Sequence, residues 1–406
     1  MTKQGNTNLP SSRFIDTFTV VPLGCAKNQV DAEELIIRLE AGGYVYSPEP
    51  DNADLIIINT CGFIRAAKEE SIRETVEMRE RFPDRKIVLA GCFSQRYGAS
   101  LLEKLPEIDG VFGNRDLSRI GSFVSSLAAA GNHLDGVTDQ IDGSPLCPAP
   151  DVKTAQTAPA AQVVPTAPAE GPSRSRLLGF PGSVYVKIAE GCDNRCSYCA
   201  IPLIRGDLRS RELKSVVKEI DDFIDRGVFE IVLIAQDLSS YGVDRGGNSL
   251  LLPLLEEVSA LPGNFWIRLL YIHPDHFPFE ILDLCANDRR ILPYFDLPFQ
   301  HASAGLLSRM NRRGNRETYL TLVDTIRGAL PDAVIRSTFL LGFPGENGKA
   351  FRELRGFIEE ARVDWGGFFT YSREEGTPAY RFRGGLGDVL SRGPARRRME
   401  ELREIQ

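Results

Sequence analysis

From Thr17 onward, the sequence alternates short β-rich runs with amphipathic helical patterns. In its first part, a helical pattern follows each of the runs TFTVVPLGC, ADLIIINTCGF and RKIVLAGCF. Such alternation is typical of an α/β domain whose parallel sheet is covered by helices on both faces. The sequence therefore predicts an N-terminal domain with a doubly wound parallel sheet over residues 14–144.

Residues 145–182 interrupt this alternation. They are rich in Pro, Ala and Thr, and no aromatic residue occurs between Phe123 and Phe180. Because such a segment cannot bury enough apolar surface to offset its ordering entropy, we interpret it as a linker. Six further strand–helix units follow in residues 183–406, which predicts a TIM-like barrel or a partial (βα)6 barrel with its chemistry at the carboxyl ends of the strands.

Composition and charge exclude several classes of protein. No stretch approaches the roughly 18 apolar residues that a membrane span needs, and the N-terminus, MTKQGNTNLPSSRF, lacks the apolar core of a signal peptide. We therefore expect a cytoplasmic protein with no membrane partner. Lys and Arg total 48 against 55 Asp and Glu, a net charge of −7, so the chain lacks a global basic field for gripping nucleic acid.

Three of the eight cysteines follow predicted strands of the first domain, and each has a glycine beside it: Cys25, Cys61 and Cys92. In a reducing compartment, metal binding or catalysis is a better prior for cysteines than disulfides. The carboxyl edge of an open α/β sheet is where ligands bind, so these thiols are predicted to converge there. The alternative for each thiol is a small buried residue at a strand end.

A second cysteine group, Cys192-x3-Cys196-x2-Cys199, lies in EGCDNRCSYC directly after the first strand of the second block. Structural zinc needs four protein ligands, and the nearest downstream histidine is the distant His273. We therefore favour an iron–sulfur cluster with one open iron over a zinc site or three core thiols. Of the other two cysteines, Cys147 lies in the linker as a bystander, and Cys285 fits the apolar face of a core helix.

The C-x3-C-x2-C pattern, with Tyr198 before its third cysteine, resembles the signature of radical S-adenosylmethionine (SAM) enzymes. Together with the first cysteine group on an α/β domain, it makes the chain similar to the methylthiotransferase family across residues 15–406, apart from the linker. The resemblance implies a partial (βα)6 radical SAM barrel, two 4Fe–4S clusters and SAM as both radical source and methyl donor. It assigns the auxiliary cluster to Cys25, Cys61 and Cys92, and the radical SAM cluster to Cys192, Cys196 and Cys199.

Three segments, AIPLIRGDLRSR, LPFQHAS and AQDLSSYGVD, resemble the branch of this family that acts on a ribosomal protein. That branch methylthiolates the β-carbon of an aspartate in the twelfth protein of the small subunit, with electrons from a flavodoxin or ferredoxin. The alternatives are methylthiolation of a tRNA adenosine and a non-catalytic iron–sulfur redox sensor. The family usually ends in a small β-barrel, the TRAM domain. Because the sequence stops at Gln406 in a helical pattern, we expect that domain to be absent.

The same resemblance marks residues for binding SAM. GFPGE, with Gly342 and Gly345, resembles the glycine segment that passes the adenosine. Gln300 and Arg336, on the fourth and fifth barrel strands, are candidates to hydrogen-bond the SAM carboxylate or ribose, with ordinary salt bridging as the alternative.

Other polar residues near these segments have a structural interpretation beside the functional one. We interpret three histidines mainly as structural: His273, His276 and His301. A basic strip follows the second cysteine group, either as a solvated loop or as a contact for an acidic or phosphate-bearing partner: Arg205, Arg209 and Arg211.

Overall fold

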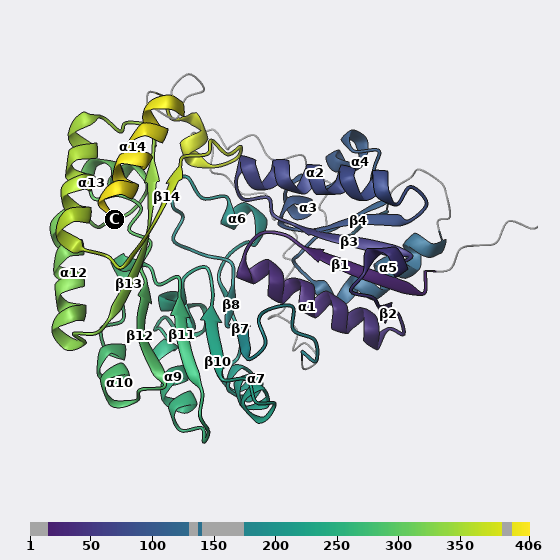
Figure 1. Ribbon diagram of the computed structural model, residues 1–406, viewed down its shortest axis with the longest axis horizontal. Helices are drawn as coiled ribbons and strands as arrows, with labels where there is room; N and C mark the ends of the chain where they lie inside the picture. The colour runs from purple at the N-terminus through teal and green to yellow at the C-terminus, as the bar shows by residue number, and fades with distance from the viewer. Residues whose placement is uncertain (1–14, 130–136, 140–173, 384–391) are drawn as a thin grey trace, which may run out of the picture.

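The computed structural model describes residues 15–129, 137–139, 174–383 and 392–406. Two parallel sheets, each with its own helices, lie side by side (Figure 1). Cys147 and residues 145–173 of the predicted linker lie outside the described residues. Within the described ranges, no helix is long and apolar enough to cross a membrane.

The first sheet has the strand order β2-β1-β3-β4-β5-β6, and all of its pairings are parallel. β1 and β3 are nearly continuous apolar runs, as expected of strands that are covered on both faces. The strands are β1 (Thr17–Pro22), β2 (Val45–Tyr46), β3 (Leu55–Thr60), β4 (Lys86–Gly91), β5 (Gly110–Phe112) and β6 (Val137–Asp139).

Helices cover both faces of this sheet, which confirms the doubly wound prediction. Alternate residues of β3 face opposite ways: Leu55 and Ile57 pack under two helices, and Ile56 and Ile58 pack under three others. The first face carries α1 (Ala26–Ala41) and α5 (Ile120–Ala129). The second carries α2 (Arg65–Arg81), α3 (Cys92–Tyr97) and α4 (Ala99–Lys104).

The second sheet has the order β14-β13-β12-β11-β10-β7, again with parallel pairings throughout. Its first and last strands form the two edges, so the sheet is the open, partial form of a (βα)6 barrel, as predicted. The strands are β7 (Ser183–Lys187), β10 (Glu230–Ile234), β11 (Trp266–Leu270), β12 (Ile291–Asp296), β13 (Val334–Leu341) and β14 (Trp365–Thr370). A short antiparallel pair, β8 (Ala189–Glu190) and β9 (Arg209–Ser210), extends from β7.

One continuous apolar core joins the outer face of this sheet to its helices. The longer helices that flank the sheet are α7 (Leu213–Asp225), α9 (Leu251–Ser259), α10 (Ile281–Asn287), α12 (Arg316–Ala329), α13 (Gly348–Ala361) and α14 (Arg392–Ile405). Shorter ones lie in the connections: α6 (Ile201–Ile204), α8 (Val243–Gly246) and α11 (Ala304–Arg309). Cys285 lies in this core and is 5% exposed, which confirms its assignment.

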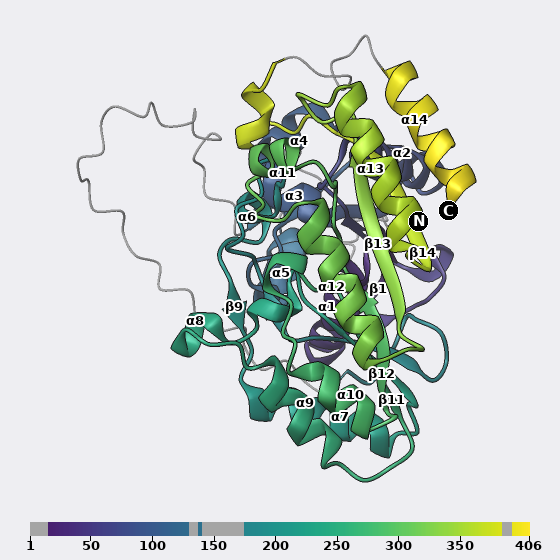
Figure 2. The same ribbon diagram turned by 90° about the vertical axis from the view of Figure 1, so that its left-hand side faces the viewer.

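Helix α1 of the first domain packs against the inner face of the barrel sheet (Figures 1 and 2). Val30 of α1 contacts Val232 and Ile234 of β10, whereas the neighbouring residues Ile231 and Leu233 point into the outer core. Because Cys25 directly precedes α1, this packing places Cys25 near the carboxyl ends of the barrel strands.

The end of the predicted linker, residues 174–182, differs from our expectation that the segment does not pack. Arg174 is buried and forms ion pairs with Glu33 of α1 at 2.5 Å and with Glu219 of α7 at 2.8 Å. It thereby joins the two domains. Composition missed this because the segment is held by paired charges and not by apolar area.

Glu374, after β14, makes a second connection between the domains. Its carboxylate accepts hydrogen bonds from Lys68 at 2.8 Å and from Arg96 at 2.6 Å, and both donors belong to the first domain. The Glu374 side chain is 2% exposed. Two buried ionic contacts thus fix the orientation of the sheets.

Candidate functional site

The first cysteine group lies at one edge of the first sheet. Cys25 precedes α1, Cys61 follows β3 and Cys92 begins α3 after β4, and β1, β3 and β4 are direct neighbours. A Cβ atom added to Gly24 would lie 2.8 Å from Cys61 Cβ and 3.4 Å from Cys61 Sγ. The turn that leads into Cys25 thus lies against Cys61, and Cys92 follows the strand beside it at the same sheet edge.

Gly91 sets the approach to Cys92. Its φ of +90° is a left-handed conformation that favours glycine. An added Cβ would lie 2.3 Å from Asn59 Oδ1 and 2.8 Å from Thr60 O. A side chain at this position would push β4 away from β3, and so separate Cys92 from Cys61.

Asn28, in the first turn of α1, ties these strand ends together. Its Nδ2 donates to Leu23 O at 3.0 Å and to Thr60 O at 2.9 Å. Its Oδ1 accepts from Cys92 Sγ at 3.3 Å and from Arg205 Nη2 at 3.0 Å. Sequence reasoning missed this residue, although an amide three positions after a strand-end cysteine was the available signal.

The second cysteine group occupies one loop after β7 and β8. Gly191 has a φ of +72°, and an added Cβ would lie 1.9 Å from Asp207 O, so only glycine fits. The segment that follows α11 anchors the loop from outside: Ser197 N donates to Met310 O at 3.0 Å, and Asn311 Nδ2 donates to Arg195 O at 3.0 Å. This anchor was not evident from the sequence.

Burial shapes the chemistry of both cysteine groups. It raises the pKa of Cys192 to about 11 and that of Cys199 to about 12. It also raises the pKa of Cys61, and raises that of Cys92 to about 12. Such thiols stay protonated at neutral pH until a bound cation stabilises the thiolate, so loading with iron would release protons.

The donor sets fit iron–sulfur clusters. Each group offers three thiols, and thiolates that hold a cluster bind separate irons. Cys92 Sγ also accepts from Arg205 Nη2 and Asn114 Nδ2, each at 3.4 Å, and hydrogen bonds of this kind tune a cluster. Within the described part of the chain, no group of three or more His, Cys, Asp or Glu side chains is arranged to hold a metal ion.

The two groups face each other across the domain interface. Cys92 packs against Ala200, which directly follows Cys199, and against Ile204 of α6, and Phe63 completes this cluster. Arg205, at the end of the same segment, reaches back to Cys92. A substrate held between the two groups would therefore contact both domains.

Of the residues predicted to bind SAM, Arg336 lies on β13, whereas Gln300 lies beyond the end of β12 and not on the fourth strand as predicted. Gln300 has a φ of +65°, and its backbone bridges Thr338 and Leu340 of β13. Arg336 Nη1 lies 3.1 Å from Asp296 Oδ2, so this residue forms the salt bridge that was the alternative interpretation. In the loop after β13, Gly342 N donates to Glu346 and Gly345 contacts Arg309.

Buried polar atoms without a hydrogen-bond partner gather at the carboxyl ends of the barrel strands. They belong to Gln236 after β10, His273 after β11 and Asp296 at the end of β12. Burial lowers the pKa of His273 to about 4 and raises the pKa of Asp296. These groups fit a polar ligand, since buried polar atoms are ordinarily paired. Sequence reasoning missed Gln236 and Asp296.

His301 is only half satisfied by hydrogen bonds, because its buried Nε2 has no partner among the described residues. Its Nδ1 accepts from Ala302 N and Ser303 N, each at 2.9 Å, and burial lowers its pKa to about 3, so the ring is neutral. His273 and His276 are ring neighbours, with centroids 5.2 Å apart.

The basic strip is not a solvated loop at Arg205. This side chain is 2% exposed and is paired with Asp31 and Glu190, each at 2.8 Å. Arg211 likewise pairs with Glu219 at 2.5 Å. Arg205 therefore joins the domains and does not recognise an external partner.

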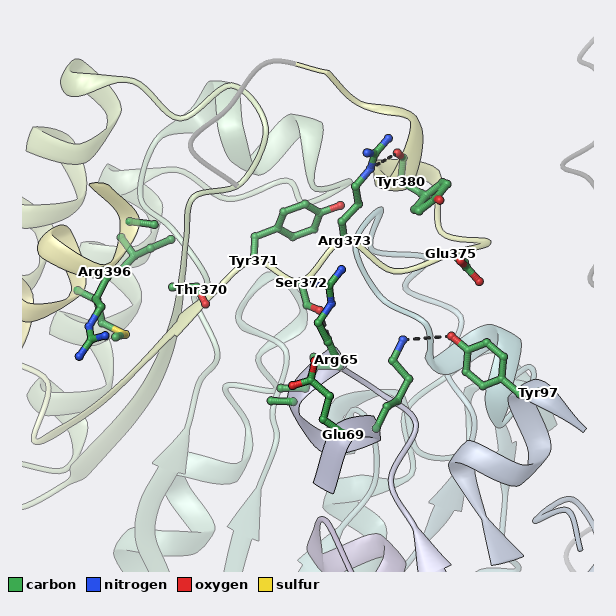
Figure 3. Close-up of a pocket in the computed structure, with 16 residues that line it drawn as sticks. Arg65, Glu69, Tyr97, Thr370, Tyr371, Ser372, Arg373, Glu375, Tyr380 and Arg396 are labelled. Carbon is green, nitrogen blue, oxygen red and sulfur yellow. Dashed lines mark hydrogen bonds between the residues drawn. The ribbon is translucent and has the colours of Figure 1, made fainter. Parts of the chain in front are cut away.

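A cavity of about 590 Å³ opens where the two domains meet (Figure 3). From the first domain it is lined by Ile64 and Arg65, which follow Cys61 closely, and by Tyr97. From the barrel it is lined by Leu341, which precedes Gly342, and by Tyr371. The cavity thus adjoins the segment that follows Cys61 and the segment that leads to Gly342.

Comparison with known proteins agrees with this two-site architecture. The pattern described as "Uncharacterized protein family UPF0004" matches residues 17–113, and that of the "Radical SAM superfamily" matches residues 186–358. Over 400 residues the chain is 42% identical to the ribosomal protein uS12 methylthiotransferase RimO of Treponema denticola, covering 94% of this chain and 80% of the relative. It is 41% identical over 362 residues to the protein of that name from Syntrophomonas wolfei, covering 88% and 76%.

Solved structures show the same fold. The radical SAM methyltransferase TsrM of Kitasatospora setae, solved with cobalamin and a 4Fe-4S cluster bound, has a TM-score of 0.64 and 18% identity over 89% of this chain and 73% of its own. The cobalamin-dependent radical SAM enzyme OxsB has a TM-score of 0.56 and 12% identity, covering 95% and 56%.

Fold and sequence matches together define a radical SAM enzyme, and its N-terminal domain carries three further cysteines at the carboxyl edge of its sheet. The chain belongs to the methylthiotransferase family, in the group named ribosomal protein uS12 methylthiotransferase RimO. The resemblance seen in the sequence is confirmed.

Proposed function

We propose that this chain methylthiolates the β-carbon of an aspartate in ribosomal protein uS12. The observation that carries the proposal is the pair of three-cysteine sites that face each other across the domain interface, in a chain about 40% identical to RimO enzymes over most of its length. No ordinary general base removes a hydrogen from an unactivated aspartate β-carbon at neutral pH, so a family that uses radical chemistry suits this reaction.

Three sets of residues would hold the cofactors. Cys192, Cys196 and Cys199 would bind the radical SAM cluster, and Cys25, Cys61 and Cys92 would bind the auxiliary cluster. SAM would lie against Gln300, Arg336, Gly342 and Gly345. When bound, these groups supply a carbon-centred radical that abstracts hydrogen, together with the sulfur and the methyl group that are transferred.

Residues at the carboxyl ends of the barrel strands line the region where this reaction would take place. The barrel strands bury Gln236, His273 and Asp296 with polar atoms free to accept or donate. Apolar contacts of Cys92 with Ala200 and Ile204 bury one side of the auxiliary site.

We further propose that the electrons come from a flavodoxin or ferredoxin and that the enzyme works in the cytoplasm, where its ribosomal substrate is made. Support for this partner comes from the low potential that such a cluster requires. Purified chain with each candidate donor, assayed for 5′-deoxyadenosine, would test it.

The test of the function is a reaction of the iron-loaded chain with SAM, a chemical reductant and either purified uS12 or unmodified tRNA, followed by mass spectrometry. We expect a methylthio group on one aspartate of uS12 and none on tRNA. Modification of a tRNA adenosine alone would move the chain to the tRNA branch. Production of 5′-deoxyadenosine with neither product would contradict both functions.

A further inference from the structure

Lys27 lies in the first turn of α1, two residues after Cys25, and reaches across the domain interface. Its Nζ stands 3.5 Å from the centroid of the Tyr271 ring, at the carboxyl end of β11. The residue is 8% exposed. It therefore places a positive charge inside the barrel mouth, on the side of the first cysteine group.

This position is costly for a cation. Burial removes its hydration, and no hydrogen bond or ion pair of Lys27 Nζ occurs among the described residues to compensate. The positive end of a helix dipole also disfavours a cation in the first turn of α1.

The other buried cations of the interface are all paired. Lys187 pairs with Asp31 and Glu190, and Arg205 pairs with the same two carboxylates. Arg174 pairs with Glu33 and Glu219. Lys27 is the exception in this part of the described chain, which indicates a charge kept for a group that the protein does not itself supply.

The surroundings of Lys27 leave it available. The groups that act on its charge are Cys25 on its own helix, and Arg205, Glu190 and Asp296 from the barrel domain. Glu190 is taken by Lys187 and Arg205, and Asp296 by Arg336. Among these carboxylates, Asp296 keeps one oxygen, Oδ1, without a hydrogen-bond partner, but it forms no ion pair with Lys27, so an incoming anion that reaches Nζ directly would outcompete it.

The backbone conformation of Tyr271 is an independent indication that the position of its ring beside Lys27 is functional. Its φ is +69°, a conformation in which a bulky residue is strained. Such strain is found where a side chain must be held for function. Here the ring lies against the ammonium group and fixes its direction by a cation–π contact.

We propose that Lys27 binds the side-chain carboxylate of the substrate aspartate. This inference rests on the proposed function and adds the residue that gives the site its specificity. In aspartate the carboxyl carbon is bonded directly to the β-carbon, so an ion pair to Lys27 fixes the reacting carbon between the two cysteine groups. An adenine ring carries no such anion, and Lys27 therefore selects a protein substrate over a nucleoside.

The test compares two uS12 peptides, one with the native aspartate and one with asparagine, on the iron-loaded enzyme with SAM. We expect wild-type enzyme to bind the aspartate peptide roughly 30-fold more tightly or better, since a buried charge pair is involved. In Lys27→Gln the two peptides should bind within about threefold of each other, and Lys27→Arg should recover part of the preference. Lys349→Gln, a change at an exposed lysine on α13, is the matched control and should behave as wild type.

Several outcomes would overturn the inference. An unchanged Asp-to-Asn preference in Lys27→Gln, with iron content and wild-type methylthiolation intact, removes the role of Lys27 but leaves the proposed function standing. Loss of peptide-independent SAM cleavage in Lys27→Gln would place the contact on SAM instead. If wild-type enzyme modifies neither peptide nor whole uS12, the proposed function itself fails. Because Lys27→Arg keeps the charge, its iron content and preference separate misfolding from lost recognition.

Discussion

Both cysteine groups supply three thiols, but the sequence positions these thiols in different ways. Cys192, Cys196 and Cys199 share one loop, whose shape depends on Gly191 and on contacts from the segment after α11. Cys25, Cys61 and Cys92 come from three strand ends, separated by 36 and 31 residues, and meet only when β1, β3 and β4 pair in register. The first arrangement is local and the second depends on the whole domain.

This difference predicts different sensitivities. The loop of the second group keeps its three cysteines in place as long as the turn at Gly191 and the contacts from the segment after α11 remain. The dispersed group depends on strand pairing, on Asn28 and on Arg205, which the other domain provides. Damage to the first domain or to its docking should therefore impair the auxiliary site before the radical SAM site.

The largest effect should come from the two glycines. Gly91→Ala puts a Cβ 2.3 Å from Asn59 Oδ1, and Gly191→Ala puts one 1.9 Å from Asp207 O, each at positive φ. Each variant should lose the iron of its own site alone and so retain about half of the wild-type iron. Iron analysis with electron paramagnetic resonance of the reduced proteins measures this. Loss of all iron in either variant would show that the sites form together.

Arg205→Met should have the next largest effect. It leaves Asp31 and Glu190 buried with one cation fewer and removes the hydrogen bond to Cys92 Sγ. We expect a loss of about 3–5 kcal/mol in the free energy of unfolding, because uncompensated buried charge is costly. Urea denaturation measures it, and the iron of the auxiliary site should fall more than that of the compact site. Equal losses of iron from the two sites would show that the dispersed site is no more sensitive than the compact one.

The contacts of Glu374 between the two domains should make the stability of the protein depend on pH. Burial alone would raise the pKa of Glu374, but hydrogen bonds from Lys68 and Ser372, together with the charge of Lys68 and the bond from Arg96, outweigh it and lower the pKa. The stabilisation is then full above the unfolded pKa of about 4.3 and is lost as the pH falls through the lower folded value.

Glu374→Gln should cost about 1–3 kcal/mol at neutral pH and flatten this acid limb. Thermal unfolding measured from neutral pH down to values below the unfolded pKa of about 4.3 detects both effects. Glu401→Gln, at an exposed pair with Arg355, is the control and should retain the wild-type profile. A Glu374→Gln profile identical to wild type would show that this contact does not hold the domains.

The smallest effect is expected at Cys285. It lies in the apolar core of the barrel and belongs to neither cysteine group. Burial raises the pKa of its thiol to about 12. Cys285→Ala should cost about 1 kcal/mol and leave iron content and activity unchanged. A loss of iron in this variant would mean that the assignment of six cysteines is incomplete.

The sequence alone predicted the parts that depend on local pattern. Strand–helix alternation predicted both sheets, and glycine-flanked cysteines at strand ends predicted the first convergence, because parallel strands share one carboxyl edge. The second group was evident from spacing within ten residues.

What the sequence could not predict depends on distant partners. Arg205 meets Asn28 across 177 positions, and Arg174 meets Glu33 across 141, so no periodicity reports either contact. A run of arginines looks solvated in a sequence, and only the fold reveals that Arg205 is buried. Lys27 is informative for the opposite reason, since the fold buries it without supplying a carboxylate.

The most direct test of the division between the two sites measures two products in one reaction. Iron-loaded Cys25→Ala and Cys196→Ala would each be given SAM, a reductant and uS12, and 5′-deoxyadenosine and methylthiolated uS12 would be quantified together. We predict that Cys196→Ala makes neither product, and that Cys25→Ala makes 5′-deoxyadenosine without methylthiolated uS12. Methylthiolated uS12 from Cys25→Ala, or 5′-deoxyadenosine from Cys196→Ala, would contradict the assignment of the two sites.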